Sequence, residues 1–183
     1  MWLKMSDELF DGEEITLEEI LDAREKRVSM QQKILETYPN SSLLVATMNI
    51  PGSIKNSIGL MAIFVEAVAY IEHQLADVVP NVRICHSKKT GAEYYLSVNL
   101  LPEKLKKKMI QIEETYKYGR LFDLDVIWFD EKLKNISRQV LKHPSRKCLI
   151  CQKDAKECGR SRQHSIEELQ NKIYEMVSIG KEQ

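Results

Sequence analysis

A stretch of twelve residues, Gly119 to Asp130, limits the fold of this chain most strongly. Its sequence, GRLFDLDVIWFD, has the alternation of a β-strand but carries two acids in an otherwise apolar run. Side chains alternate between the two faces of a strand. One face therefore holds four large apolar side chains, which we expect to pack on a core: Phe122, Leu124, Val126 and Trp128. Asp123 and Asp125 share the opposite face with Leu121 and Ile127.

The two carboxylates predict a cation site. They lie about 6–7 Å apart along a strand that rises roughly 3.3 Å per residue. At about 5 Å and an effective dielectric constant near 20, their repulsion is roughly 3 kcal/mol. Mg²⁺ removes this repulsion, since it binds carboxylate oxygens and leaves coordination positions for phosphates. The alternative is a solvated strand face, but apolar residues on both faces favour a Mg²⁺ site at Asp123 and Asp125.

Composition narrows the class of protein. The 183 residues fit one domain, 1–183, and 43% hydrophobic residues are enough for a core. Lys+Arg and Asp+Glu both number 27, so the formal net charge is zero, and we expect neither nucleic-acid nor membrane binding. The longest apolar run, Ile58 to Ile71, is too short to span a bilayer and contains Glu66. It predicts a buried helix.

The N-terminus and the cysteines indicate the compartment. The first fourteen residues, MWLKMSDELFDGEE, are acidic and lack the apolar segment of a signal peptide. Four cysteines without such a signal are typical of a reduced, cytoplasmic protein.

Start and stop signals outline the elements. Thr16 to Glu19 form a capping box that opens a helix to about Tyr38, before Pro39. Four residues make its expected apolar stripe: Leu17, Leu21, Val28 and Leu35. A second capping box, Ser165 to Glu168, opens a C-terminal helix. The remaining expected elements are strands at 43–49, 82–87 and 93–100, helices at about 57–77 and 102–116, and an irregular Cys- and Arg-containing segment at 130–164. This order predicts an α+β domain with a mixed sheet of about four strands and flanking helices.

Two further segments are candidate anion sites. In NIPGSIKNS, the turn at Gly52 and the side chain of Lys55 precede a helix start, where backbone N–H groups attract phosphate. It is not a P-loop, and an ordinary strand-to-helix turn is the favoured interpretation. In CGRSRQHS, Arg160, Arg162 and His164 lie just before the helix that Ser165 caps. Guanidinium groups at a helix N-terminus suit phosphate, and the alternative is a solvated basic loop.

The cysteines allow a metal site. Cys148, Cys151, Cys158 and His164 form a C-x2-C-x6-C-x5-H pattern, which has the residue types and number of a structural Zn²⁺ site. The alternative is three small buried thiols beside a phosphate-binding histidine, and from the spacing alone we favour this alternative.

Taken together, several short segments resemble one family, the citrate lyase holo-acyl-carrier-protein synthases, or apo-citrate lyase phosphoribosyl-dephospho-CoA transferases. Small differences from the family pattern occur at Ser53, Ala92 and Gly159, none of them a charged position. The segments that carry the resemblance are REKR with QQ (24–32), NIPGSIKNS (49–57), TGAE (90–93), GRLFDLDV (119–126), ISR (136–138) and RKCLICQKDAKECGRSRQHS (146–165).

The resemblance implies transfer of the 2′-(5″-triphosphoribosyl)-3′-dephospho-CoA group to a serine of the citrate lyase acyl carrier subunit, with release of pyrophosphate. This is nucleotidyltransferase chemistry, which depends on positioning and charge stabilisation. It would make Asp123 and Asp125 the catalytic, Mg²⁺-binding residues. Three residues would stabilise the departing pyrophosphate: Arg160, Arg162 and His164. Four others would be further substrate contacts, Glu93 as a third carboxylate: Gly52, Lys55, Glu93 and Arg120.

The resemblance leaves the fold and the acceptor open. Familiar nucleotidyltransferases carry a Gly-Ser element shortly before the paired acids, whereas Gly52-Ser53 precedes Asp123 by about 70 residues. A nucleotidyltransferase-like fold would therefore be rearranged here, or Gly119 would belong to a substitute turn. The same chemistry could serve the carrier protein of malonate decarboxylase. A different class is a non-enzymatic zinc-knuckle binding module, which predicts bound zinc and dispensable Asp123 and Asp125.

Overall fold

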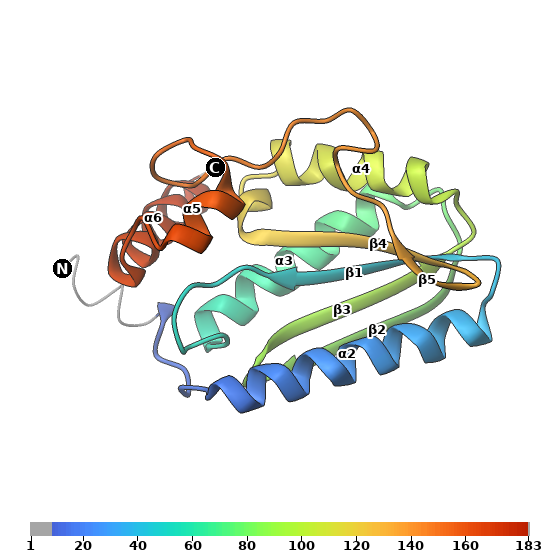
Figure 1. Ribbon diagram of the computed structural model, residues 1–183, viewed down its shortest axis with the longest axis horizontal. Helices are drawn as coiled ribbons and strands as arrows, with labels where there is room; N and C mark the ends of the chain where they lie inside the picture. Colours follow the sequence, from blue (N-terminus) through green and yellow to red (C-terminus); the bar gives the residue numbers. More distant parts are fainter. Residues whose placement is uncertain (1–8, 183) are drawn as a thin grey trace.

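A five-stranded sheet forms the centre of the protein, which a computed structural model describes over residues 9–182 (Figure 1). The spatial order is β2-β3-β1-β4-β5, and each pair of neighbouring strands is antiparallel. The strands are β1 (Ser42–Met48), β2 (Pro80–Lys88), β3 (Gly91–Val98), β4 (Phe122–Asp130) and β5 (Lys132–Asn135). The α+β class is confirmed, with five strands where about four were expected and antiparallel pairing where a mixed sheet was expected.

The connections explain the antiparallel pairing. Helix α3 (Ile58–Gln74) joins β1 to β2, and α4 (Pro102–Thr115) joins β3 to β4. Each helix connects two strands that run in the same direction, but another strand lies between them, so no parallel neighbours result. The order β1-α3-β2-β3-α4-β4 with this strand arrangement is the split βαβ, or ferredoxin-like, topology. Among residues 9–182, no helix is both long and apolar enough to cross a bilayer.

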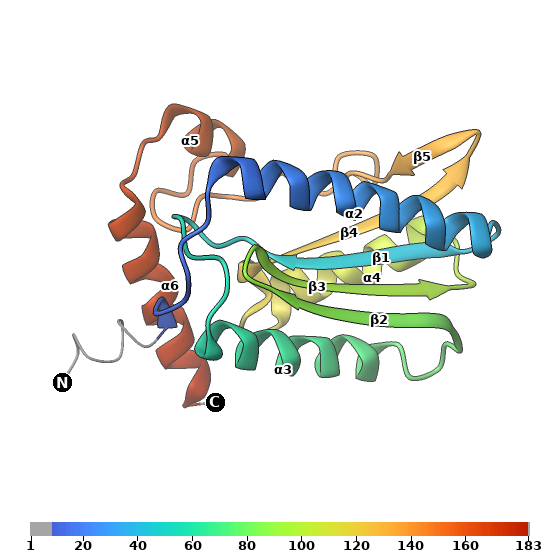
Figure 2. The ribbon, with the colours of Figure 1, turned by 90° about the horizontal axis from the view of Figure 1, so that it is seen from below.

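Helices cover both faces of the sheet. Apolar residues of α3 and α4 form the main core with one face, and they include the fully buried Phe64 and Leu105. Helix α2 (Leu17–Thr37) crosses the other face and forms a smaller cluster there through Ile34 and Leu35 (Figure 2). The alternation is as predicted from Phe122 onward, because Phe122, Leu124 and Val126 are all buried in the main core. The expected place of Leu121 on the opposite face is wrong, because residues 119–121 form a short 3-10 helix before the strand begins and Leu121 is buried in the main core.

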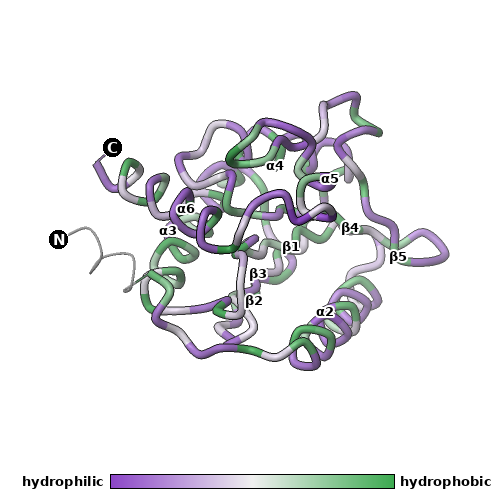
Figure 3. The backbone as a smooth tube through the Cα atoms, turned by 60° about the vertical axis from the view of Figure 1, so that its left-hand side comes forward, coloured by the Kyte–Doolittle hydropathy of each residue, from purple (hydrophilic) through white to green (hydrophobic). Residues whose placement is uncertain are grey.

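The predicted apolar stripe of α2 is wrong at three of its four positions. Leu17, Leu21 and Val28 are 71%, 49% and 51% exposed, and only Leu35 is buried. The surface that faces the sheet includes Ala23 and Arg27 instead. The cause lies in the sheet, because below the N-terminal half of α2 it presents Glu93, which pairs with an arginine. Figure 3 shows hydrophobic and hydrophilic residues interleaved along the length of this helix.

The segment 130–164 is more regular than predicted. Glu131, in a left-handed conformation, turns the chain from β4 into β5. The short helix α5 (Ala155–Ser161) begins at Asp154, whose carboxylate accepts hydrogen bonds from the backbone N–H groups of Lys156 and Glu157. The capping box at Ser165 is confirmed and opens α6 (Ile166–Lys181). Helices α5 and α6 lie together at one end of the sheet (Figure 2).

The sheet order also resolves the distance between the Gly-Ser turn and the acids. Because β1 and β4 are neighbours, Met48 pairs with Phe122, and the N–H of Asn49 donates to the carbonyl of Leu121 at 2.8 Å. The turn at Gly52 follows β1 directly. It therefore lies beside the start of the strand that carries the acids, although about 70 residues separate the two in sequence.

Candidate active site

A row of polar residues crosses the sheet face that α2 covers. The register aligns His86, Glu93, Thr47 and Asp123 across four neighbouring strands, and Asp125 occupies the next row on the same face. Asp123 is half-buried and Asp125 is exposed. The prediction that the two acids share one face of β4 is therefore confirmed.

Asp123 accepts a hydrogen bond from the guanidinium of Arg146, which also donates to the carbonyl of Phe122. Burial raises the pKa of Asp123, the Arg146 charge opposes this rise, and the nearby Asp125 charge adds to it. The net direction is a raised pKa, chiefly because the carboxyl is buried. Two adjacent carboxylates of this kind are a donor set that fits a hard divalent cation such as Mg²⁺.

A buried polar network holds Arg146 at the edge of β4. Strand β5 pairs only with the second half of β4, from Ile127 onward, so side chains satisfy the first half. Glu113 of α4 accepts from the N–H of Leu124 at 3.0 Å, and Lys106 donates to the carbonyl of Leu124 at 2.6 Å. The second carboxylate oxygen of Glu113 accepts from Arg138 at 2.6 Å and lies 4.0 Å from Nε of Arg146.

A cleft of about 710 Å³ opens beside this network, where β1 ends and β4 begins. Three arginines line it: Arg120, Arg146 and Arg162. Its other walls include Pro51, the N-terminus of α6 at Ser165 and the segment 147–164, here called the cysteine segment. Burial lowers the pKa of Arg120, and the charges of Arg146 and Arg138 lower it further. Closely spaced guanidiniums beside a helix N-terminus are an arrangement that suits an anion.

Glu93, predicted as a third carboxylate of the site, is paired with neighbouring side chains. It is 1% exposed, and its oxygens accept from Arg27 at 2.9 Å, Lys88 at 2.8 Å and Tyr95 at 2.8 Å. Burial alone would raise the pKa of Glu93, but these two hydrogen bonds from Lys88 and Tyr95 and the Arg27 charge outweigh it and lower the pKa. With its oxygens engaged in this way, Glu93 anchors Arg27 and Lys88 on the same sheet face as the acid pair, with Thr47 of β1 between Glu93 and Asp123.

The other predicted contacts divide between the cleft and its surroundings. Arg120, Arg162 and His164 line the cleft, whereas Arg160 lies exposed on α5 and does not. Lys55 donates to the carbonyl of Ile50, and burial together with the Arg24 charge lowers the pKa of Lys55.

Gly52 is required by the turn at the end of β1. Its φ of 92° favours glycine, and an added Cβ would lie 3.0 Å from Gln170 and 3.1 Å from Ile166 of α6. The side chain of Gln170 also donates to the carbonyl of Pro51 at 3.2 Å. Gly52 therefore lets the turn pack against α6 at the cleft, and its predicted contact with substrate stays a prediction.

The sequence interpretation assigned no role to Arg146, Arg138, Glu113 or Arg27. Two signals were present. Arg138 and Arg146 lie inside segments that carry the family resemblance, and Glu113 is an acid on the apolar side of α4, next to the buried Ile112. Neither signal names the partner of each residue, because the partners come from other elements.

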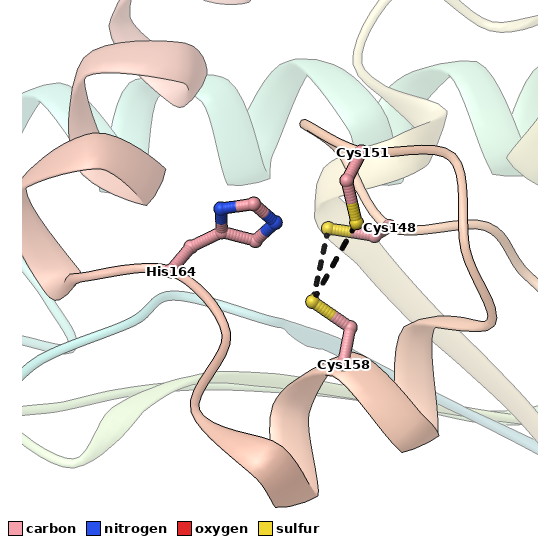
Figure 4. Close-up of side chains that lie close together, drawn as sticks. All are labelled: Cys148, Cys151, Cys158 and His164. Carbon is pink, nitrogen blue, oxygen red and sulfur yellow. Dashed lines mark hydrogen bonds between the residues drawn. The ribbon is translucent and has the colours of Figure 1, made fainter.

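The cysteine segment brings four side chains together at the wall of the cleft. The ligand atoms of Cys148, Cys151, Cys158 and His164 all lie within 4.8 Å of one another. Figure 4 shows the three sulfur atoms grouped together, with the imidazole ring of His164 facing them. The three cysteines are not disulfide-bonded.

Comparison with known proteins identifies the family. Residues 15–179 match the family model described as apo-citrate lyase phosphoribosyl-dephospho-CoA transferase. A relative from Streptococcus pyogenes, named probable apo-citrate lyase phosphoribosyl-dephospho-CoA transferase, is 44% identical over 93% of this chain and 90% of its own length. A Vibrio cholerae protein of the same name is 34% identical over 89% and 92%. Protein CitXG of Leuconostoc mesenteroides is 32% identical over 91% of this chain and 36% of its own length. The chain belongs to the apo-citrate lyase phosphoribosyl-dephospho-CoA transferase family.

Proposed function

We propose that this protein attaches the 2′-(5″-triphosphoribosyl)-3′-dephospho-CoA group to a serine of the apo-citrate lyase acyl carrier subunit and releases pyrophosphate. Family membership supports transfer of a phosphoribosyl-dephospho-CoA group. One observation supports the site: Arg146 contacts Asp123 and also lines the arginine-rich cleft, so this one side chain links the acid pair to the cleft, although the two acids are not among the residues that line it.

The reaction needs one bond formed and one broken. The serine oxygen bonds to the innermost phosphorus of the triphosphate, and the bond from this phosphorus to the bridging oxygen of pyrophosphate breaks. The serine proton is released, and a phosphodiester joins the prosthetic group to the carrier. Catalysis of such a step consists mostly of positioning and charge stabilisation.

Asp123 and Asp125 would hold Mg²⁺ in this proposal. When bound, Mg²⁺ would offset negative charge on the reacting phosphate oxygens. Arg146 now occupies one oxygen of Asp123, and in the loaded site we expect it to share this carboxylate or to turn toward the phosphate. Its other contacts, near Glu113 and with Phe122, keep the guanidinium within reach of both positions.

The three cleft arginines would stabilise the departing pyrophosphate. Charge develops on that group as the bond breaks, and preorganised guanidiniums stabilise it most when water is largely excluded. The cleft volume of about 710 Å³ lies within the roughly 300–1,000 Å³ range of small-molecule sites. We expect it to hold the triphosphate and ribose, while the longer pantetheine arm extends outside.

Mass spectrometry of the carrier tests this proposal. Apo carrier, the triphosphoribosyl precursor, Mg²⁺ and the protein are incubated together, and pyrophosphate is measured in parallel. We expect the carrier to gain the mass of the precursor minus pyrophosphate, on a serine, with one pyrophosphate per carrier. A carrier with this serine replaced by alanine is the matched control. An unchanged mass would refute the proposal, and faster loading of a malonate decarboxylase carrier would change the acceptor while preserving the chemistry.

A further inference from the structure

The four-residue cluster at the cleft wall has the composition and convergence of a metal site. We propose that Cys148, Cys151, Cys158 and His164 bind one structural Zn²⁺ ion with tetrahedral Cys₃His coordination. The spacing in sequence did not favour zinc over three buried thiols. The positions of the ligand atoms do, for three reasons: the sulfur spacing, the orientation of His164 and the surrounding backbone.

The sulfur atoms have the spacing that zinc requires. Sγ of Cys158 lies 3.4 Å from Sγ of Cys148 and 3.9 Å from Sγ of Cys151. Tetrahedral zinc with Zn–S bonds of about 2.3 Å places its sulfur ligands about 3.8 Å apart. A disulfide would bring two of them to about 2.0 Å. The observed spacing therefore agrees with a shared ion and not with a covalent bond.

The imidazole completes the set. Nε2 of His164 is buried and has no hydrogen-bond partner among the described residues. A buried polar atom left in this state costs about 1–3 kcal/mol. Figure 4 shows a ring nitrogen of His164 directed toward the three sulfurs. A neutral imidazole nitrogen is a preferred zinc ligand, so the ion would remove this cost.

The backbone around the cysteines is folded to support such an ion. The N–H of Cys148 donates to the carbonyl of Lys153 at 2.7 Å, which closes a loop around Cys151. Within it, the N–H of Ile150 donates to Sγ of Cys148 at 3.4 Å. The left-handed Gln152, with a φ of 60°, turns the chain immediately after Cys151. Outer hydrogen bonds of this kind orient the ligands of metal sites.

Helix α5 and the turn that follows it position the other two ligands. Asp154 caps the helix, and Cys158 lies on its buried side. Arg162, with a φ of 48°, ends the helix in a left-handed conformation and reverses the chain, which brings His164 back toward the cysteine loop. The ligands thus come from a tight loop, a helix and the residue before α6, and one ion would fasten all three.

The proposed role of this ion is structural. All four positions are filled by protein side chains, so none is open for substrate, as in other closed zinc sites. In the segment 137–165, only Cys148 and Cys158 are buried. Two buried side chains stabilise a segment of this length only weakly. In small segments of this kind, a structural metal can take the place of a hydrophobic core. The same segment supplies Arg146 and Arg162 to the cleft, so zinc would fix part of the anion site, and His164 would serve the metal.

Metal content tests the proposal directly and without substrate. We expect the purified protein, grown with zinc and never exposed to chelators, to contain one zinc per chain by plasma mass spectrometry. Cys158→Ser and His164→Ala should retain much less. Cys85→Ser is the matched control, because Cys85 is an exposed free cysteine on β2, outside the cluster. It should retain one zinc.

Two further measurements remain decisive if a variant does not fold. Wild-type protein reconstituted with Co²⁺ should show the absorption of tetrahedral, thiolate-bound cobalt. His164→Cys should fold and still bind one zinc through four cysteines. Wild-type protein that contains no zinc and binds neither metal would overturn the proposal, as would equal zinc loss in Cys85→Ser. These metal measurements use the protein without carrier or precursor, so failure of the zinc proposal is distinguishable from failure of the transferase reaction.

Discussion

Glu113 connects the fold to the acid pair, and its replacement by glutamine gives a quantitative prediction. Its side chain is 4% exposed. One oxygen accepts from the backbone N–H of Leu124 at 3.0 Å, and the other accepts from Arg138 at 2.6 and 3.2 Å. Glu113→Gln keeps the first oxygen but turns an amide N–H₂ group toward two guanidiniums. The change therefore removes two charge-assisted hydrogen bonds and the negative charge between Arg138 and Arg146.

The expected cost follows from these contacts. A hydrogen bond to a charged group contributes about 1.5–3 kcal/mol, and breaking a buried ion pair costs about 3–5 kcal/mol. Arg138 is only 12% exposed but keeps its second contact with Glu114 at 2.8 Å, which reduces the loss. We therefore expect the free energy of unfolding to fall by about 3 kcal/mol. For a domain of this size, that corresponds to a Tm lower by roughly 6–12 °C.

Thermal and urea unfolding measure this difference, with Glu114→Gln as the matched control. Glu114 pairs with the same arginine but is 47% exposed, so its loss should cost less than about 1 kcal/mol. Glu113→Gln should also slow carrier loading, since the neighbouring Arg146 loses the nearby carboxylate charge. Equal destabilisation by the two variants, or none by either, would refute the description of a buried network at the edge of β4.

Three further predictions concern other parts of the site and its support. Glu93→Gln should lower the free energy of unfolding by about 2–4 kcal/mol. Because the folded pKa of Glu93 is lowered, this stabilisation is complete above the ordinary value of 4.5 and is lost as pH falls through the folded value, which acid unfolding of the two proteins would show. Gly119→Ala should lower the free energy of unfolding in urea by about 1–3 kcal/mol, since the added Cβ would overlap a backbone carbonyl of α4. Gly159→Ala should not lower it, because no atom lies within 4 Å of a Cβ added there. Carboxyl NMR titration should give Asp123 a pKa above the ordinary 3.8, chiefly because its carboxyl is buried, and Asp125→Asn should lower this pKa; a pKa of Asp123 that Asp125→Asn leaves unchanged would contradict interaction between the two carboxylates.

Local features of the fold were predictable from the sequence. Both capping boxes, at Thr16 and Ser165, form as expected because their hydrogen bonds join residues three positions apart. The alternation along β4 also holds, since the period of a strand fixes which side chains share a face. These features depend on neighbours in the chain and on little else.

Features that depend on distant partners were not predictable. The sheet order places β3 between strands of equal direction, and no local pattern specifies this. The apolar residues Leu17 and Val28 suggested a buried stripe on α2, but Arg27 faces the sheet because Glu93, 66 residues away, accepts its hydrogen bond. Arg146 and Asp123 likewise pair across 23 positions in sequence, with strand β5 between them.

The central claim is that the acid pair on β4 carries the transfer reaction. The most direct test is the initial rate of carrier loading, followed by intact mass, for Asp123→Asn, Asp125→Asn and a control, Asp130→Asn. Asp130 lies on the same strand but is exposed and paired with Lys134 at its far end. Loss of a metal-binding carboxylate removes several kcal/mol of charge stabilisation, so we expect both site variants to be slowed at least about 100-fold. The control should load the carrier at the wild-type rate. Loading by Asp123→Asn and Asp125→Asn as fast as by the control would contradict the claim.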